Sequence, residues 1–137
     1  MGSDRKSEHS DQRSEGARSF EDLWIWQTAR ELVGLIYQDF REGTPGAHDF
    51  GFRTHIQKTG ISAMNNIAEG FERRTESEFA RFLDISKGSC GEVRSMYYVA
   101  EDLSYVTPSI AESRRQRVRQ LASGIASLAD RLRRHDS

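Results

Sequence analysis

The residues best suited to chemistry are seven arginines near the C-terminus. Between Pro108 and the end of the chain, only three acidic residues accompany them. The planar guanidinium group forms paired hydrogen bonds with phosphates and with carboxylates, so the cluster indicates nucleic-acid contact or ion pairs between subunits. A third interpretation is the solvated face of a helix, whose dipole favours positive charge at the C-terminal end. The seven are Arg114, Arg115, Arg117, Arg119, Arg131, Arg133 and Arg134.

A second polar group occupies one helical stripe in the middle of the chain, at about 100° of rotation per residue. Amides beside an apolar face often belong to hydrogen-bond networks between helices. We therefore expect contacts between helices or subunits here, while direct RNA contact and a solvated face stay open as alternatives. The group consists of Asn65, Asn66, Glu69 and Arg73.

Motifs typical of enzymes are missing from the sequence. It contains no G-x-x-x-x-G-K-[ST] phosphate loop, no G-x-G-x-x-G, no C-x-x-C and no H-E-x-x-H. No histidine has a glutamate three residues before it, as a di-iron bundle requires. Cys90 has no visible activating base, so we expect a small buried side chain. The sequence predicts no catalytic residue, metal, cofactor or small-molecule substrate.

Length and composition indicate one helical domain. The chain has 137 residues, 36% of them hydrophobic and 30% charged, and only two prolines. The net charge of −1 conceals a gradient, because residues 20–107 carry nine basic and fourteen acidic side chains. No segment has the length of a membrane span or the pattern of a signal peptide. We therefore expect a cytoplasmic protein without a membrane partner.

The apolar spacing predicts helices over residues 20–42, 52–72, 75–103 and 108–133, after a disordered tail over residues 1–19. Thr75 with Glu78 fits a capping box, and Thr107 precedes a proline suited to a first helical turn. Ile25 and Trp26 widen the apolar surface of the first helix, at a core edge or in a subunit interface. The predicted fold is all-α, an antiparallel up-down four-helix bundle over residues 20–134. The seam of the last helix is Val118, Leu121, Ile125, Leu128 and Leu132.

Three segments together resemble one bacterial family: FEDLWIWQ at residues 20–27, NIAEGF at residues 66–71, and EFARFLDISKGS at residues 78–89. The chain is similar to the four-helix-bundle proteins encoded in intervening sequences of large-subunit rRNA genes. Such proteins are similar in fold to accessory proteins of diversity-generating retroelements, which work with a reverse transcriptase. The resemblance implies an up-down bundle, a ring-like homopentamer and a nucleic-acid-binding role, with RNA or a reverse-transcriptase-type protein as partner.

Two functions follow as expectations. The first is a non-enzymatic, homo-oligomeric bundle that binds structured RNA or a nucleoprotein partner through its arginines. The alternative is a protein-interaction scaffold that binds no nucleic acid and uses its arginines in subunit contacts. The salt dependence of binding distinguishes the two functions, because the affinity for phosphates falls log-linearly with salt concentration.

Overall fold

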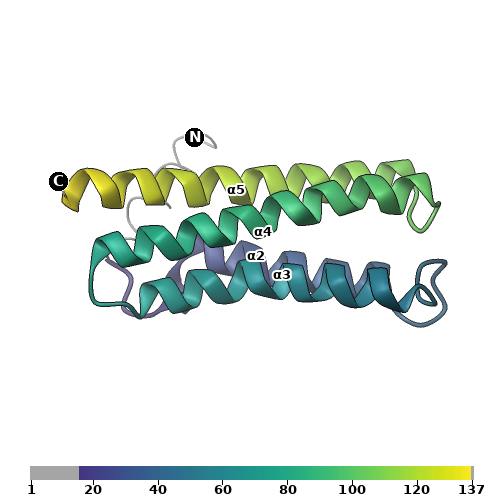
Figure 1. The fold of residues 1–137 in the computed structure, drawn as a ribbon, viewed down its shortest axis with the longest axis horizontal. Coiled ribbons are helices and arrows are strands. Elements are labelled where there is room, and N and C mark those ends of the chain that lie inside the picture. Colours follow the sequence, from purple (N-terminus) through teal and green to yellow (C-terminus); the bar gives the residue numbers. More distant parts are fainter. Residues whose placement is uncertain (1–15, 137) are drawn as a thin grey trace.

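The computed structural model describes residues 16–136, which form one short 3₁₀ helix and four α-helices. Helices adjacent in sequence run in opposite directions, which confirms the predicted up-down bundle (Figure 1). The predicted tail lies outside the described residues, apart from residues 16–19. The elements are η1 (Phe20–Asp22), α2 (Trp24–Asp39), α3 (Phe50–Phe71), α4 (Glu76–Asp102) and α5 (Pro108–Asp136).

Two helices begin where the sequence predicted, because a threonine hydroxyl accepts a hydrogen bond from a first-turn amide. Thr75 Oγ1 accepts from the Glu78 amide at 3.1 Å at the start of α4. Thr107 Oγ1 accepts from the Ile110 amide at 3.1 Å at the start of α5. Such caps satisfy amides that have no partner within the helix.

The other two helices differ from the prediction at their ends. Extended backbone at Leu23 separates η1 from α2, so the predicted first helix is interrupted, and it ends at Asp39 rather than residue 42. The α3 helix begins at Phe50, two residues early, because the Asp49 carboxylate accepts a hydrogen bond from the Phe52 amide at 3.2 Å. Asp49 also accepts one from the Tyr105 hydroxyl at 2.6 Å.

All four helices contribute to one apolar core. The predicted α5 seam is buried along its whole length. Ile25 is buried and Trp26 packs edge-on against Phe20 with ring centroids 5.1 Å apart, so both extend the core within a single chain. Cys90 is buried on α4, and this burial raises the pKa of its thiol to about 12. A thiol held protonated in this way is not a nucleophile.

The end of α3 passes so close to α4 that only glycine fits at residue 70. A β-carbon built there would lie 2.8 Å from Phe82 Cβ and 3.2 Å from the Phe79 carbonyl oxygen. Neither atom is the tip of a flexible side chain, so the clash cannot be relieved by a rotamer change. Gly70 of the NIAEGF segment therefore permits this close packing of α3 against α4.

We expect Gly70→Ala to lower the free energy of unfolding by about 1–3 kcal/mol, because overpacking outweighs the better helix propensity of alanine. Gly91→Ala on α4 is the matched control, since no atom lies within 4 Å of its added β-carbon. The control should leave stability unchanged or raise it by about 0.5–1 kcal/mol. Urea denaturation of both variants measures the difference, and equal midpoints would contradict the close-packing argument.

Candidate functional site

Arg114, the first of the candidate arginines, lies inside the bundle. Its guanidinium group donates two hydrogen bonds of 2.8 Å to the Asp39 carboxylate on α2. The Tyr97 hydroxyl on α4 donates to the same carboxylate at 2.7 Å. The side chains of Arg114 and Asp39 are only 10% and 6% exposed. Hydrogen bonding to Asp39 raises the pKa of Arg114, and burial raises that of Tyr97.

Arg115 is also buried, and its contacts join α4 to α5. Its guanidinium group pairs with Glu101 at 2.9 Å and with Glu112 at 3.1 Å. The same group lies over the Tyr98 ring, 4.0 Å from the centroid. Arg114 and Arg115 therefore act between helices of one chain, and the arginines available to an external phosphate are the other five.

Arg117, Arg119 and Arg133 form ion pairs at the surface. Arg117 pairs with Glu31 at 3.1 Å and Arg119 with Glu112 at 3.6 Å. Arg133 pairs with Asp84 on α4. Exposed pairs of this kind contribute little to stability and exchange readily with other partners, so these guanidinium groups remain accessible to an anionic ligand.

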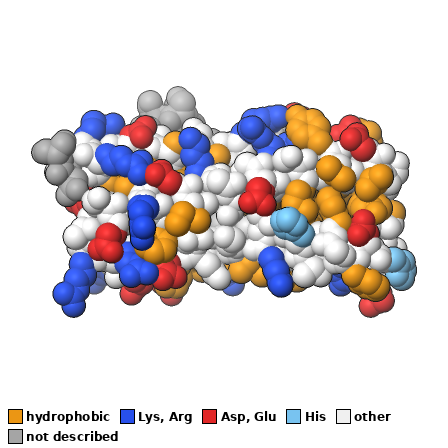
Figure 2. All heavy atoms as spheres, in the orientation of Figure 1, with side chains coloured by type: hydrophobic (Ala, Val, Ile, Leu, Met, Phe, Trp, Pro, Cys, Tyr) orange, Lys and Arg blue, Asp and Glu red, His pale blue; other side chains and the backbone are white. Residues whose placement is uncertain are grey.

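One end of the bundle brings together arginines from two regions of the sequence. The last turns of α5 lie beside the α3–α4 connection, where His135 approaches Glu76 at 3.9 Å (Figure 1). Lys and Arg side chains gather at this end, interspersed with acidic ones (Figure 2). We call it the arginine-rich end, and it comprises Arg73, Arg74, Arg81, Arg131, Arg133 and Arg134.

Arg74 and Arg81 are not among the arginines that the sequence predicts to bind nucleic acid. Both flank the α3–α4 connection, whereas the C-terminal cluster lies about fifty residues further along the chain. The antiparallel path of α5 brings them together, so the up-down topology predicted from the sequence was the signal that could have identified them. Arg73 and Arg81 lie over the Phe82 ring, at 4.6 and 5.6 Å from its centroid.

The polar stripe on α3 divides into an inner and an outer part. Asn66 donates to the carbonyl oxygen of Ser62 at 2.8 Å, and the Ser62 hydroxyl lies 3.0 Å from that of Ser89 on α4. Glu69 and Arg73 instead form an exposed pair at 2.8 Å on the same helix. Asn65 is exposed. Asn66 thus bonds within α3 to Ser62, which makes the contact to α4, and the other three residues lie at the surface.

The opposite end of the bundle exposes large hydrophobic side chains. Phe50, the first residue of α3, is 65% exposed, and exposed side chains from the end of α4 and the following residue accompany it. Figure 2 shows hydrophobic groups gathered toward this end. Exposed apolar clusters commonly mark surfaces for protein contact. We call this group the apolar patch, and it comprises Phe50, Tyr98, Val99 and Leu103.

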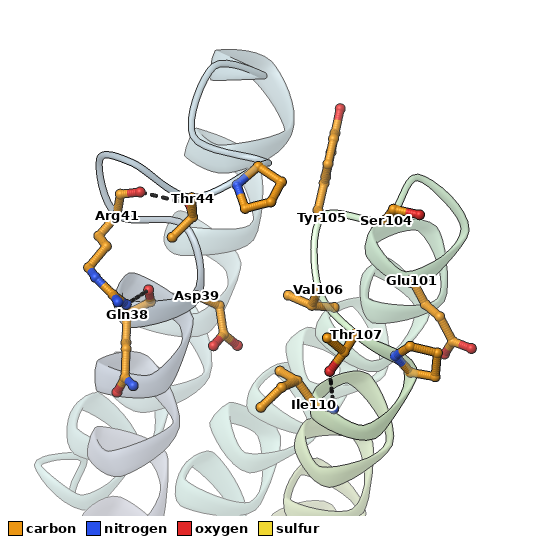
Figure 3. A pocket seen from close by; sticks show the side chains of 12 residues that line it. Gln38, Asp39, Arg41, Thr44, Glu101, Ser104, Tyr105, Val106, Thr107 and Ile110 are labelled. Atoms are coloured by element: carbon orange, nitrogen blue, oxygen red, sulfur yellow. Dashed lines mark hydrogen bonds between the residues drawn. The ribbon is translucent and has the colours of Figure 1, made fainter.

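A cavity of about 480 Å³ lies between the end of α2 and the segment that joins α4 to α5 (Figure 3). Asp39 and Glu101 line it, but Arg114 and Arg115 already neutralise these carboxylates. Arg41 and Thr44 both bond to backbone carbonyl groups. Within residues 16–136, no group of three or more His, Cys, Asp or Glu side chains is arranged to hold a metal ion. The cavity therefore offers no assembled catalytic group.

The family model for 23S rRNA-intervening sequence proteins matches residues 21–127. The chain belongs to this family. The match runs from η1 into α5 and ends before Arg131, Arg133 and Arg134, so it includes the apolar patch but not the α5 part of the arginine-rich end. No curated protein matches the chain. For this 23S rRNA-intervening sequence protein, none of the helices in the described part has the length and apolar character needed to cross a membrane.

We expect Arg114→Leu to lower the free energy of unfolding by about 3–5 kcal/mol, because it leaves the Asp39 carboxylate buried without a counter-charge. Arg117→Leu removes an exposed pair from the same helix and should cost less than about 1 kcal/mol. Chemical denaturation followed by circular dichroism measures both. Similar losses for the two variants would show that the buried pair does not hold the helices together.

Proposed function

We propose that this rRNA-intervening sequence protein is a non-enzymatic helical bundle that self-associates and binds structured RNA. The observation that carries RNA binding is the arginine-rich end, where α5 and the α3–α4 connection contribute exposed guanidinium groups to one site. Arginine is well suited to phosphates because its fork of donors matches two phosphate oxygens. The family description, which refers to ribosomal RNA, supports RNA as the nucleic acid.

Self-association is proposed from the apolar patch. Four large apolar or aromatic side chains are exposed at the end of the bundle away from the arginine-rich end. Aromatic side chains are enriched where protein surfaces meet, and covering them removes apolar area from water. A pentamer remains the expected stoichiometry, as the family resemblance implies. A patch at one end and arginines at the other let assembly and RNA binding proceed on separate surfaces.

A protein-interaction scaffold without nucleic-acid binding is the second candidate. The ion pairs Glu69–Arg73 and Asp84–Arg133 show that the arginine-rich end also holds acidic side chains. The whole chain carries a net charge of −1, which provides no general attraction to RNA. In this case the arginines join subunits or a partner protein, such as one of the reverse-transcriptase type.

We expect the combined change of Arg131, Arg133 and Arg134 to glutamine to weaken binding to a structured rRNA fragment at least tenfold. Because each lost phosphate contact lowers the salt slope by about one, log affinity against log salt should flatten by about 2–3. The double variant Arg117→Gln with Arg119→Gln is the control, because both residues lie nearer the start of α5 and outside the arginine-rich end. Fluorescence anisotropy at several salt concentrations measures both.

An unchanged slope in the triple variant would place RNA binding elsewhere on the bundle. If the wild-type protein binds no RNA at low salt, the scaffold replaces the RNA-binding proposal.

We expect Val99→Glu with Leu103→Glu to lower the mass in solution measured by light scattering, because each charge would be buried without a partner in the interface. Ile85→Glu is the control, since its side chain lies on α4 outside the patch and is 47% exposed against 42% for Val99. Circular dichroism of each variant verifies that the helices remain folded. A wild-type protein with the mass of a monomer would contradict self-association.

A further inference from the structure

An open groove of about 530 Å³ lies beside the arginine-rich end, between η1 and the last turns of α3. It is formed where the interrupted start of the first helix passes over the outer face of the NIAEGF segment. Neither proposed surface uses it, although one of its residues, Arg73, also belongs to the arginine-rich end. The groove is lined by Phe20, Asn65, Ala68, Glu69, Glu72 and Arg73.

The two neighbouring asparagines of α3 have different surroundings. Asn66 donates to Ser62 and is occupied within the bundle. Asn65 points its exposed side chain to the groove, and no hydrogen bond joins its amide to another residue of the described part. An amide offers two donors and one acceptor, so Asn65 presents a complete set of hydrogen-bonding groups to a ligand.

Asn65 and Glu69 are four residues apart, so their side chains are neighbours on the helix surface. The groove therefore presents an amide donor next to a carboxylate acceptor, with the aromatic ring of Phe20 among the same lining residues. Arg73 pairs with Glu69 through one oxygen, Oε1. A carboxylate has about four lone-pair sites, and the remaining ones can accept from a ligand.

Among the RNA bases, guanine matches this arrangement. Its Watson–Crick edge places two N–H donors, N1 and N2, next to the O6 acceptor. The carboxylate of Glu69 would accept from the two donors while the Asn65 amide donates to O6. Adenine lacks the adjacent donor pair, and cytosine and uracil lack it as well. The base must be unpaired, since pairing occupies the same edge.

We propose that this groove binds an unpaired guanine of the RNA, an inference that rests on the proposed RNA binding. The carboxylates of Glu69 and Glu72 repel phosphate at the groove, so a neutral base with donors is the component of RNA that fits there. Arg73 links the groove to the arginine-rich end, where the flanking phosphates bind. RNA-binding proteins commonly read splayed bases with aromatic and polar side chains in this way.

The test uses hairpin RNAs that differ only in one loop base. Wild-type protein should bind the guanine loop about tenfold more tightly than the adenine loop, as expected for a paired set of base contacts. Inosine, which lacks the N2 amino group, should fall between them. Asn65→Ala should reduce the preference, because the contact to O6 is lost while the Glu69 contacts remain, and it should leave the salt slope unchanged. Gln120→Ala, which removes an exposed amide from α5, is the matched control and should retain it.

Equal affinity for all loop bases, with the salt dependence intact, would overturn the guanine site and leave RNA binding in place. A preference that is undiminished in Asn65→Ala would also overturn it.

Saturation-transfer NMR with guanosine monophosphate and adenosine monophosphate tests the groove even if no hairpin binds. A signal from the guanine nucleotide that is weaker in Asn65→Ala supports the site independently of the arginine-rich end. No signal from either nucleotide in a protein that also binds no hairpin overturns both proposals.

Discussion

The carboxylate of Asp39 fixes how the helices of this bundle meet. It accepts hydrogen bonds from Arg114 on α5 and Tyr97 on α4, while it belongs to α2 itself. Taking these groups out of water is costly, and their mutual attraction offsets that cost only in one geometry. A different rotation or vertical shift of any of the three helices would leave a buried charge without its partner. We interpret the cluster as a determinant of one arrangement rather than a large source of stability.

This constraint also determines which charges remain for external partners. The arginines near the start of α5 are directed inward, where Arg115 binds two glutamates and covers Tyr98. Those near its end lie at the surface beside the α3–α4 connection. The arginines that look like one cluster in the sequence therefore divide into two groups. Those near the start of α5 form ion pairs inside the bundle, and those near its end are accessible to external partners. Only the second group joins the RNA-binding proposal.

The fold was largely predictable from the sequence, because it follows from local rules. The spacing of Leu121 and Ile125 identifies the core seam of α5, and the Thr75 hydroxyl identifies the start of α4. The site was less predictable, because its pairs join residues distant in the chain. The neighbouring sequence does not distinguish Arg114 from Arg117. Arg114 is buried because it pairs with Asp39, which lies 75 residues away in the chain. The Asp49 cap was likewise missed, since aspartate is equally common in loops.

Because the bundle has an even number of antiparallel helices, its first helix begins and its last helix ends on the same side. The chain enters the bundle at η1 and leaves it at the end of α5, on the same side as the arginine-rich end (Figure 1). The side with the apolar patch carries only the two connecting segments. A particle built by covering the patches would therefore carry the arginine-rich ends on its outer side. In such a particle, η1 and the last turns of α5 would lie on this same outer side, away from the apolar patches.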